Sequence, residues 1–299
     1  MTGHHVLRYD DAEELRAALA DRPAGAFVVL ACRPEHNALL PDALRLARPA
    51  VHHRPVAVLA ALRRLLRHPA RPLGAPIWVL AEPEVGTTRT DLARAAAFEA
   101  ARPVTLAGEP MTTIAAYPRA ETPAGLFDPP QLDAPVPDPD AAPVLCLPAS
   151  HDRRDIVGIR ARLSMSLAGL PTLVRTDFVA AVNEVLTNAY VHGTPPVDVA
   201  VWVTRGRVEC RVTDRGPGFR DPLAGYRPAP GGTRSGNGLW LARQASDELT
   251  AWAGPDGFTV RLTTAVAPGL ALQTQGALAR AEVAAARVRF RQFGNRRPR

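Results

Sequence analysis

The residues best suited to chemistry stand four apart in the segment 177–193, DFVAAVNEVLTNAYVHG. Glu184, Asn188 and His192 share this spacing, so a helix would place a carboxylate, an amide and an imidazole along one side. Apolar residues recur on another side, which indicates that the helix packs against a core. Polar rows are also common on solvated helix faces, so the row alone leaves both interpretations open.

Two glycine-rich segments downstream favour a functional interpretation. The first, DRGPGF, contains Asp214, Gly216 and Gly218 directly after a strand-like run. A carboxylate there can accept a hydrogen bond from an exocyclic amine, and glycines let a backbone approach a ligand closely. The second, GGTRSGNGLWL, carries Gly236 and Gly238 before a helix, whose first N–H groups can hold phosphate.

The order of these three segments resembles the N, G1 and G2 boxes of the GHKL ATPases. The N box corresponds to the helix with Glu184 and Asn188, the G1 box to the DxGxG segment, and the G2 box to the glycine-rich turn. The short version found here is most similar to the anti-sigma-factor serine kinases. The resemblance covers residues 143 to 264, and it implies a Bergerat α/β sandwich with ATP and Mg²⁺ as cofactors.

The resemblance also implies a role for each motif. Asp214 is expected to bind the adenine amine, Asn188 to bind Mg²⁺ through its amide oxygen, and Glu184 to act as the catalytic general base. His192 has a simpler alternative role, because the helix dipole favours a histidine at a helix C-terminus. The residues expected to contact the nucleotide are Asn188, His192, Asp214, Gly216, Gly218, Arg234, Gly236, Gly238 and Leu239.

A protein of this kind is expected to be an anti-sigma factor and serine/threonine kinase. Its implied partners are a sigma factor and a STAS-type anti-anti-sigma protein, and a homodimer is compatible with this role. One alternative is a non-catalytic ATP-binding regulator. A sensor histidine kinase is less favoured, because none of the eight histidines falls on a long helical hairpin before the ATPase segment.

Composition excludes several other functions. All 36 basic residues are arginine, which rules out a Walker A lysine, a Schiff-base lysine and a lysine general base. The net charge is +7, but the arginines are scattered except near the C-terminus, so nucleic acid is not an expected partner. No apolar run approaches the roughly 20 residues that span a bilayer, and no signal peptide is recognisable, so we expect a cytoplasmic protein without a membrane partner. The three cysteines, Cys32, Cys146 and Cys210, are expected to be buried free thiols.

Residues 1–128 are expected to form an α/β domain. Alternating strands and helices predict a parallel sheet covered on both sides. The element order, with a Glu82-Pro83 turn and a strand that ends at Tyr117-Pro118, resembles the MEDS sensory domain. The expected strands are 26–32, 76–81 and 112–117, and the expected helices are 10–20, 56–66 and 91–102.

The remaining chain divides into three expected parts. Residues 129–142 are rich in proline and aspartate, which predicts a semi-rigid linker. Residues 143–266 are expected to form the ATPase domain, a mixed sheet with helices on one face. Its expected strands are 144–147, 199–203, 208–212, 249–253 and 258–263, and its expected helices are 153–170, 177–193 and 237–246. Residues 267–299 are expected to be a basic tail with a helix over 273–291, either loosely docked or binding an anionic partner.

Overall fold

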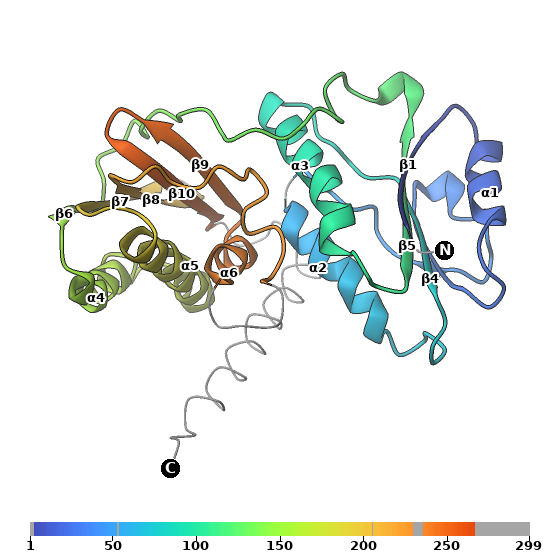
Figure 1. Ribbon diagram of the computed structural model, residues 1–299, viewed down its shortest axis with the longest axis horizontal. Helices are drawn as coiled ribbons and strands as arrows, with labels where there is room; N and C mark the ends of the chain where they lie inside the picture. The colour runs from blue at the N-terminus through green and yellow to red at the C-terminus, as the bar shows by residue number, and fades with distance from the viewer. Residues whose placement is uncertain (1–2, 53, 205, 230–235, 267–299) are drawn as a thin grey trace, which may run out of the picture. The chain divides into compact units, whose positions relative to one another are not determined.

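A computed structural model describes residues 3–52, 54–204, 206–229 and 236–266 (Figure 1). The chain divides into two compact units, Met1–Pro130 and Gln131–Arg299. The expected basic tail with its helix over 273–291 and the candidate Arg234 lie outside the described residues. None of the described helices combines the length and the apolar character that a bilayer crossing needs.

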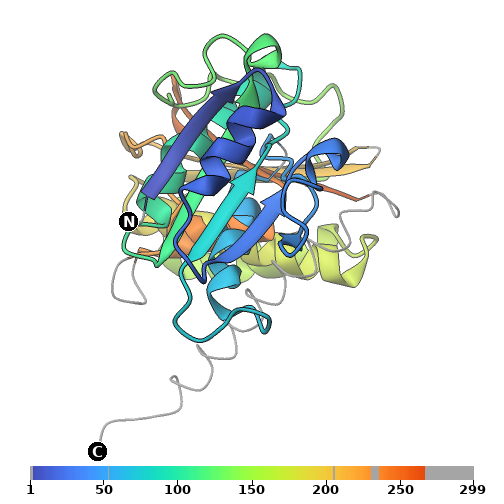
Figure 2. The ribbon, with the colours of Figure 1, turned by 90° about the vertical axis from the view of Figure 1, so that its right-hand side faces the viewer.

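The first unit contains a five-stranded parallel sheet with the order β1-β5-β4-β2-β3. In Figure 2 helix α1 lies in front of this sheet, and α2 and α3 lie behind it. The prediction of a parallel sheet covered on both sides is therefore confirmed. The strands are β1 (Gly3–Tyr9), β2 (Phe27–Ala31), β3 (Leu44–Arg45), β4 (Ile77–Ala81) and β5 (Met111–Pro118). The helices are α1 (Ala12–Ala20), α2 (Pro55–Arg64) and α3 (Arg89–Thr105), with short 3₁₀ turns η1 (Pro34–His36), η2 (Leu65–Arg67) and η3 (Arg119–Glu121).

Hydrophobic packing on each face explains this layering. Leu15 and Leu19 of α1 join a buried cluster on one face of the sheet, and Asp11 caps the helix by accepting N–H groups of its first turn. Leu65 and Leu106 join a second buried cluster on the opposite face. Each central strand therefore contributes apolar side chains to both faces, as parallel strands usually do.

The second unit contains a five-stranded sheet with the order β6-β7-β8-β10-β9 and three helices on one face (Figure 1). Among the described residues, every strand pair of this second sheet is antiparallel, so the prediction of a mixed sheet was wrong. The prediction of helices on one face is confirmed. The strands are β6 (Leu145–Ser150), β7 (Val197–Thr204), β8 (Arg207–Asp214), β9 (Glu248–Gly254) and β10 (Gly257–Ala265). The helices are α4 (Ile156–Ser166), α5 (Thr172–Val191) and α6 (Gly238–Ala245), and the 3₁₀ turn η4 (Arg153–Asp155) precedes α4.

The cysteines and the proline-rich segment both differ in part from simple expectation. Cys32 and Cys210 are buried, but Cys146 is exposed, because β6 is an edge strand and this residue lies on the side away from the helices. Residues 131–138, from the proline- and aspartate-rich segment, contact the sheet of the second unit. Asp133 donates its N–H to the carbonyl oxygen of Ala251 at 3.1 Å, and Arg211 donates to the carbonyl oxygen of Val136 at 2.9 Å.

A buried carboxylate joins the carboxyl ends of strands in the first unit. Glu82 is only 1% exposed and follows β4. Its Oε1 accepts the hydroxyl of Tyr9, while its Oε2 accepts the N–H of Arg33 at 2.7 Å and lies 2.9 Å from Nδ1 of His36. Burial alone would raise the pKa of Glu82, but these hydrogen bonds outweigh burial and lower it.

We predict that Glu82→Gln destabilises the first unit. An amide offers one acceptor oxygen where three donors converge, so a buried donor loses its partner at a cost of about 1–3 kcal/mol. Because the folded-state pKa lies below the ordinary value of 4.5, the stabilisation by Glu82 is present above that pH and is lost as the pH falls through the lowered pKa. The measurement is the protection of the β2 and β4 amides against hydrogen exchange at a series of pH values. In the natural protein this protection should fall as the pH drops through the lowered pKa of Glu82, and in Glu82→Gln it should not.

Glu121→Gln is the matched control. Glu121 pairs with the same Arg33, but its side chain is 60% exposed, so solvent screens the pair. Equal loss of protection in the two variants would contradict a special role for Glu82.

Candidate functional site

Helix α5 positions the polar row found in the sequence. Val182, Val185 and Leu186 are buried in the core, which fixes the rotation of the helix. Glu184 and Asn188 are consequently held half-buried on another side. His192 is exposed and ends the helix, and its N–H donates to the carbonyl oxygen of Asn188 at 2.8 Å.

Asp214 ends β8 as a buried carboxylate that is 6% exposed. Its Oδ1 accepts the N–H of Thr194 at 3.1 Å and the N–H of Gly216 at 2.7 Å. Arg215 donates its N–H to the carbonyl oxygen of Thr194 at 2.7 Å, which ties the end of β8 to the loop after α5. Within the described part of the chain Oδ2 has no hydrogen-bond partner, so the carboxylate keeps one oxygen as a fixed, open acceptor.

Glycines surround Asp214 because there is no room for side chains. A Cβ on Gly193 would lie 2.4 Å from Oδ1 of Asp214, and a Cβ on Gly216 would lie 2.8 Å from the same oxygen. Gly218 has a φ of +67°, and a Cβ there would lie 2.1 Å from the ring of Phe258. Protein packing alone therefore requires glycine at position 218, whether or not a ligand is bound.

A cavity of about 430 Å³ opens beside Asp214. This volume lies within the range of about 300–1,000 Å³ that is usual for small-molecule pockets. Its walls are largely apolar, and Phe219 packs edge-to-face on Phe258 with ring centroids 4.9 Å apart. The cavity can therefore hold a flat, apolar ring system whose edge meets one carboxylate oxygen.

The N-terminus of α6 meets the polar row of α5. A Cβ on Gly238, the first residue of α6, would lie 3.1 Å from Oδ1 of Asn188 and 3.2 Å from Oε2 of Glu184. Both side chains thus end beside the first turn of α6, whose leading N–H groups favour an anion. The glycine keeps this approach open.

The described part of the loop between β8 and α6 is anchored at two points. Arg243 donates to the carbonyl oxygens of Ala224 and Leu249, both at 2.9 Å, and its guanidinium lies 4.4 Å from the ring centroid of Tyr226. Asn237 accepts the N–H of Ala229 at 2.7 Å. Exposed Arg227 also lines the cavity, and no hydrogen bond or ion pair engages its guanidinium among the described residues.

The structure brings most of the predicted nucleotide-contacting residues together. Gly216 supports Asp214, Glu184 adjoins the cavity at Gly238, and Arg234 lies outside the described residues. The predicted residues that line the cavity are Asn188, His192, Asp214, Gly218, Gly236, Gly238 and Leu239.

Sequence reasoning missed two kinds of residue at this site. Gly193 and Thr194 make room for Asp214 and hold it, and the Gly-Thr pair directly after a helix was their only signal. Apolar residues also form the walls, and in the sequence they are indistinguishable from core residues. These wall residues include Val185, Val212, Phe219, Leu223, Phe258 and Val260.

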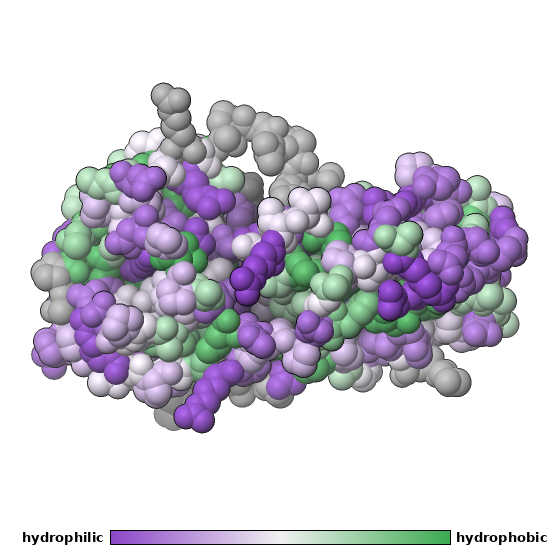
Figure 3. Space-filling view, turned by 90° about the horizontal axis from the view of Figure 1, so that it is seen from above, coloured by the Kyte–Doolittle hydropathy of each residue, from purple (hydrophilic) through white to green (hydrophobic). Residues whose placement is uncertain are grey.

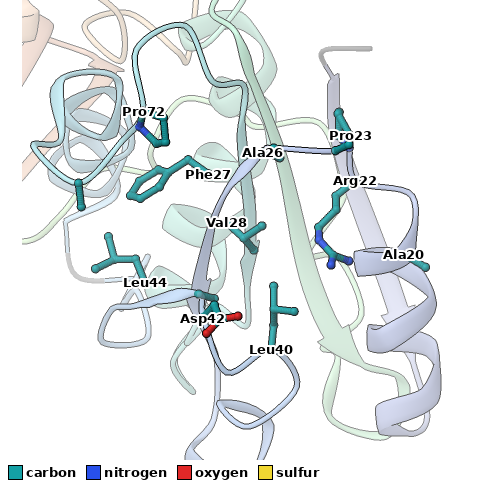
Figure 4. A pocket seen from close by; sticks show the side chains of 14 residues that line it. Ala20, Arg22, Pro23, Ala26, Phe27, Val28, Leu40, Asp42, Leu44 and Pro72 are labelled. Atoms are coloured by element: carbon teal, nitrogen blue, oxygen red, sulfur yellow. The ribbon is translucent and has the colours of Figure 1, made fainter.

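A second cavity, of about 760 Å³, lies in the first unit (Figure 4). Arg22, Phe27, Leu40, Asp42 and Leu44 are among its lining residues. The Arg22 guanidinium already donates to the carbonyl oxygen of Leu19 at 2.7 Å. This cavity gathers no set of convergent polar groups, so the cavity beside Asp214 is the stronger candidate.

The match to one protein family agrees with this choice. No curated protein matches the chain. A solved structure, "Mycobacterial sensor histidine kinase MprB", shares 26% identity over 32% of this chain and 74% of that chain, with a TM-score of 0.25. Residues 149–264, which contain the cavity and all three motifs, match the family described as the histidine kinase-like ATPase domain. This segment is therefore an ATPase domain of the histidine kinase-like, or GHKL, type.

Proposed function

We propose that the chain is an ATP-dependent regulatory kinase that phosphorylates a serine or threonine of a STAS-type anti-anti-sigma protein and controls a sigma factor. The ATPase domain supports the nucleotide part of this proposal, since domains of this type bind ATP, typically with Mg²⁺. The kinase subtype and its partners rest on the resemblance to the anti-sigma-factor serine kinases.

The open oxygen of Asp214 is the observation that carries the nucleotide part of the proposal. The carboxylate is buried, two backbone N–H groups fix it, and one acceptor remains in an apolar cavity. Adenine presents an exocyclic amine to such an acceptor, whereas guanine presents a carbonyl at the corresponding position. The site therefore fits ATP better than GTP.

The polar end of the cavity fits the phosphates and a metal ion. Asn188 offers an amide oxygen, a hard ligand suited to Mg²⁺. The first N–H groups of α6 would bind phosphate oxygens, and Arg227 would add a positive charge from the adjoining loop. Bound ATP would supply the phosphoryl group, and the residues of the chain would hold it in place.

Glu184 is the group that separates a kinase from a passive regulator. It lies one turn before Asn188 and reaches the same residue of α6. A carboxylate at that point can take the proton of an acceptor hydroxyl. We therefore assign Glu184 as the general base. The resemblance of the first unit to a sensory domain is the basis on which we assign it as the part that regulates the ATPase domain.

A sensor histidine kinase fits the chain less well. Such a kinase carries its phosphorylated histidine on helices that precede the ATPase domain. Residues 131–143 contain no helix, and residues 131–138 lie on the sheet of the second unit. The segment directly before the domain is thus a proline-rich stretch without a helix.

The first prediction concerns base recognition. In Asp214→Asn the amide oxygen should take the position of Oδ1, because the N–H groups of Thr194 and Gly216 donate there, and the NH₂ group then fills the open position. It would face the adenine amine, so ATP affinity should fall about 10- to 100-fold while the preference for ATP over GTP shrinks. Calorimetry with both nucleotides measures this. Asp221→Asn, which changes another carboxylate at the same cavity, should leave the ATP affinity nearly unchanged, and equal effects of the two variants would remove Asp214 from base recognition.

The second prediction tests the space around the carboxylate. Gly193→Ala should displace the Asp214 side chain and weaken ATP binding in a protein that still folds, because the new methyl group would lie 2.4 Å from Oδ1. Gly169→Ala is the matched control, since a Cβ there meets nothing within 4 Å. Unchanged ATP affinity in folded Gly193→Ala would show that the position of the carboxylate is not needed for binding.

The third prediction tests catalysis. Glu184→Gln keeps the shape of the side chain but removes the base, so phosphoryl transfer to a STAS-type protein should fall about 10²- to 10⁴-fold. ATP affinity should stay close to that of the natural protein. Phosphate incorporation from γ-labelled ATP is the measurement, and Asp177→Asn, two turns earlier on α5, is the control variant. Natural protein that binds ATP and partner but never labels it would refute the kinase and leave the non-catalytic regulator.

A further inference from the structure

The sheet of the second unit buries charged side chains on the face opposite its helices. Residues of β8 alternate between the core and this face, which we call the polar face. Glu209 and Arg211 of β8 and Arg261 of β10 are each less than 9% exposed, as is Trp252 of β9. Charged residues are seldom buried unless they are paired, so this face must be covered and its charges matched.

Residues 131–138, which we call the strap, cover part of the polar face. They follow Pro130, the last residue of the first unit, and run along the sheet of the second unit (green in Figure 1). Asp133 pairs with the free edge of β9, because its N–H donates to the carbonyl oxygen of Ala251 and its Oδ2 accepts the N–H of Ala251 at 2.8 Å. Leu132 packs against the hydrophobic core.

Arg211 holds the other end of the strap. Its Nη1 donates to the carbonyl oxygen of Val136 at 2.9 Å and to Oδ1 of Asp138 at 2.7 Å, and its Nη2 donates to the carbonyl oxygen of Pro137. The guanidinium also lies over two tryptophan rings, 5.3 Å from the centroid of Trp202 and 5.6 Å from that of Trp252. A planar group with several donors is suited to binding two carbonyls and a carboxylate at once.

A row of ion pairs continues from Arg211 across the sheet. Glu209 accepts Nε of Arg211 at 2.8 Å and pairs with Nη2 of Arg261 at 2.9 Å. Arg261 in turn pairs with Glu248 of β9 at 3.2 Å. The strap is therefore bound to a network that spans β8, β10 and β9 rather than to one isolated side chain.

The strands under the strap also build the nucleotide cavity. Val212 lines the cavity and is the neighbour of Arg211 in β8, and Val260 lines it and is the neighbour of Arg261 in β10. The view from above in Figure 3 shows hydrophilic and hydrophobic residues interspersed on the side turned to the viewer. On β8 and β10, neighbouring residues thus face opposite sides of the sheet, one side forming the nucleotide cavity and the other binding the strap.

We propose that the polar face is a peptide-binding surface whose resident ligand is the strap, and that strap docking and nucleotide binding stabilise each other. The coupling rests on the proposed nucleotide binding, whereas the docking does not. Shifts of β8 or β10 that accompany nucleotide binding displace Arg211 and Arg261 together with Val212 and Val260. The strap continues directly from the first unit, so this coupling connects that unit to the nucleotide site.

Hydrogen exchange in the full chain tests the docking. The reporters are two backbone N–H groups. That of Asp133 donates to the carbonyl oxygen of Ala251, and that of Ala251 donates to the carboxylate of Asp133, so both are hydrogen-bonded only while the strap is docked. Arg211→Met keeps an unbranched side chain over the tryptophans but removes every donor, and it should speed exchange at both amides by about tenfold or more. Asp133→Ala, an exposed position that does not threaten folding, should speed exchange at Ala251 in the same way. Arg207→Ala is the matched control on the same strand and face, and it should leave exchange unchanged.

Nucleotide affinity tests the coupling. Mg-ATP should slow exchange at Asp133 and Ala251 in the natural protein. Because coupling between two sites is reciprocal, releasing the strap with Arg211→Met should weaken ATP binding by the same factor. Natural exchange rates in both folded strap variants would overturn the docking. A strap freed by Arg211→Met with unchanged ATP affinity would overturn the coupling. If calorimetry shows that the natural protein binds no ATP, the coupling falls with the proposed function, while the exchange data still decide the docking.

Discussion

The second unit depends on holding one buried carboxylate, that of Asp214, with a free acceptor in an apolar cavity. Burying a carboxylate is costly unless hydrogen bonds replace its lost water. Two backbone N–H groups do so here, from Thr194 after α5 and from Gly216 after β8. The chain must therefore pass twice within contact distance of one side chain, and neither Gly193 nor Gly216 leaves room for a Cβ. The end of α5, the end of β8 and the open oxygen are consequently fixed relative to one another before any ligand binds.

The same sheet meets a different demand on its other face. Alternation along β8 places Val212 at the cavity and Arg211 on the polar face. Because protein interiors are closely packed, a strand that moves on one face cannot stay still on the other. A regulatory segment bound there can affect the nucleotide site without touching it. This arrangement gives the strap an influence that its sequence, rich in proline and aspartate, does not suggest.

The sequence predicts features that depend on nearby residues and fails where distant residues meet. Helix α5 and the strand before Asp214 are local patterns, and the structure contains both, although α5 begins at Thr172 rather than at residue 177. Strand β1 was missed, because GHHVLRY is polar for an edge strand that packs on only part of its surface. The direction of strand pairing is not written in any single strand, which is why the mixed sheet was predicted wrongly. Thr194 donates to a carboxylate 20 residues later, and the strap meets an arginine more than 70 residues later. No local sequence pattern predicts either of these long-range contacts.

The absence of lysine limits which chemical roles the basic residues can take. Every strongly basic side chain is a guanidinium, which stays protonated at any physiological pH and cannot act as a base. Arg211 shows what this group does well, since it binds two carbonyls and a carboxylate while it lies over two aromatic rings. A lysine has a single charged nitrogen and could not make these contacts together. The proton transfer that we propose therefore needs a group other than arginine, and Glu184 lies beside the first residue of α6, where a Cβ on Gly238 would be 3.2 Å from its Oε2. In this domain arginines therefore provide anchoring contacts, as Arg211 and Arg243 do, and the proton transfer that we propose falls to a carboxylate.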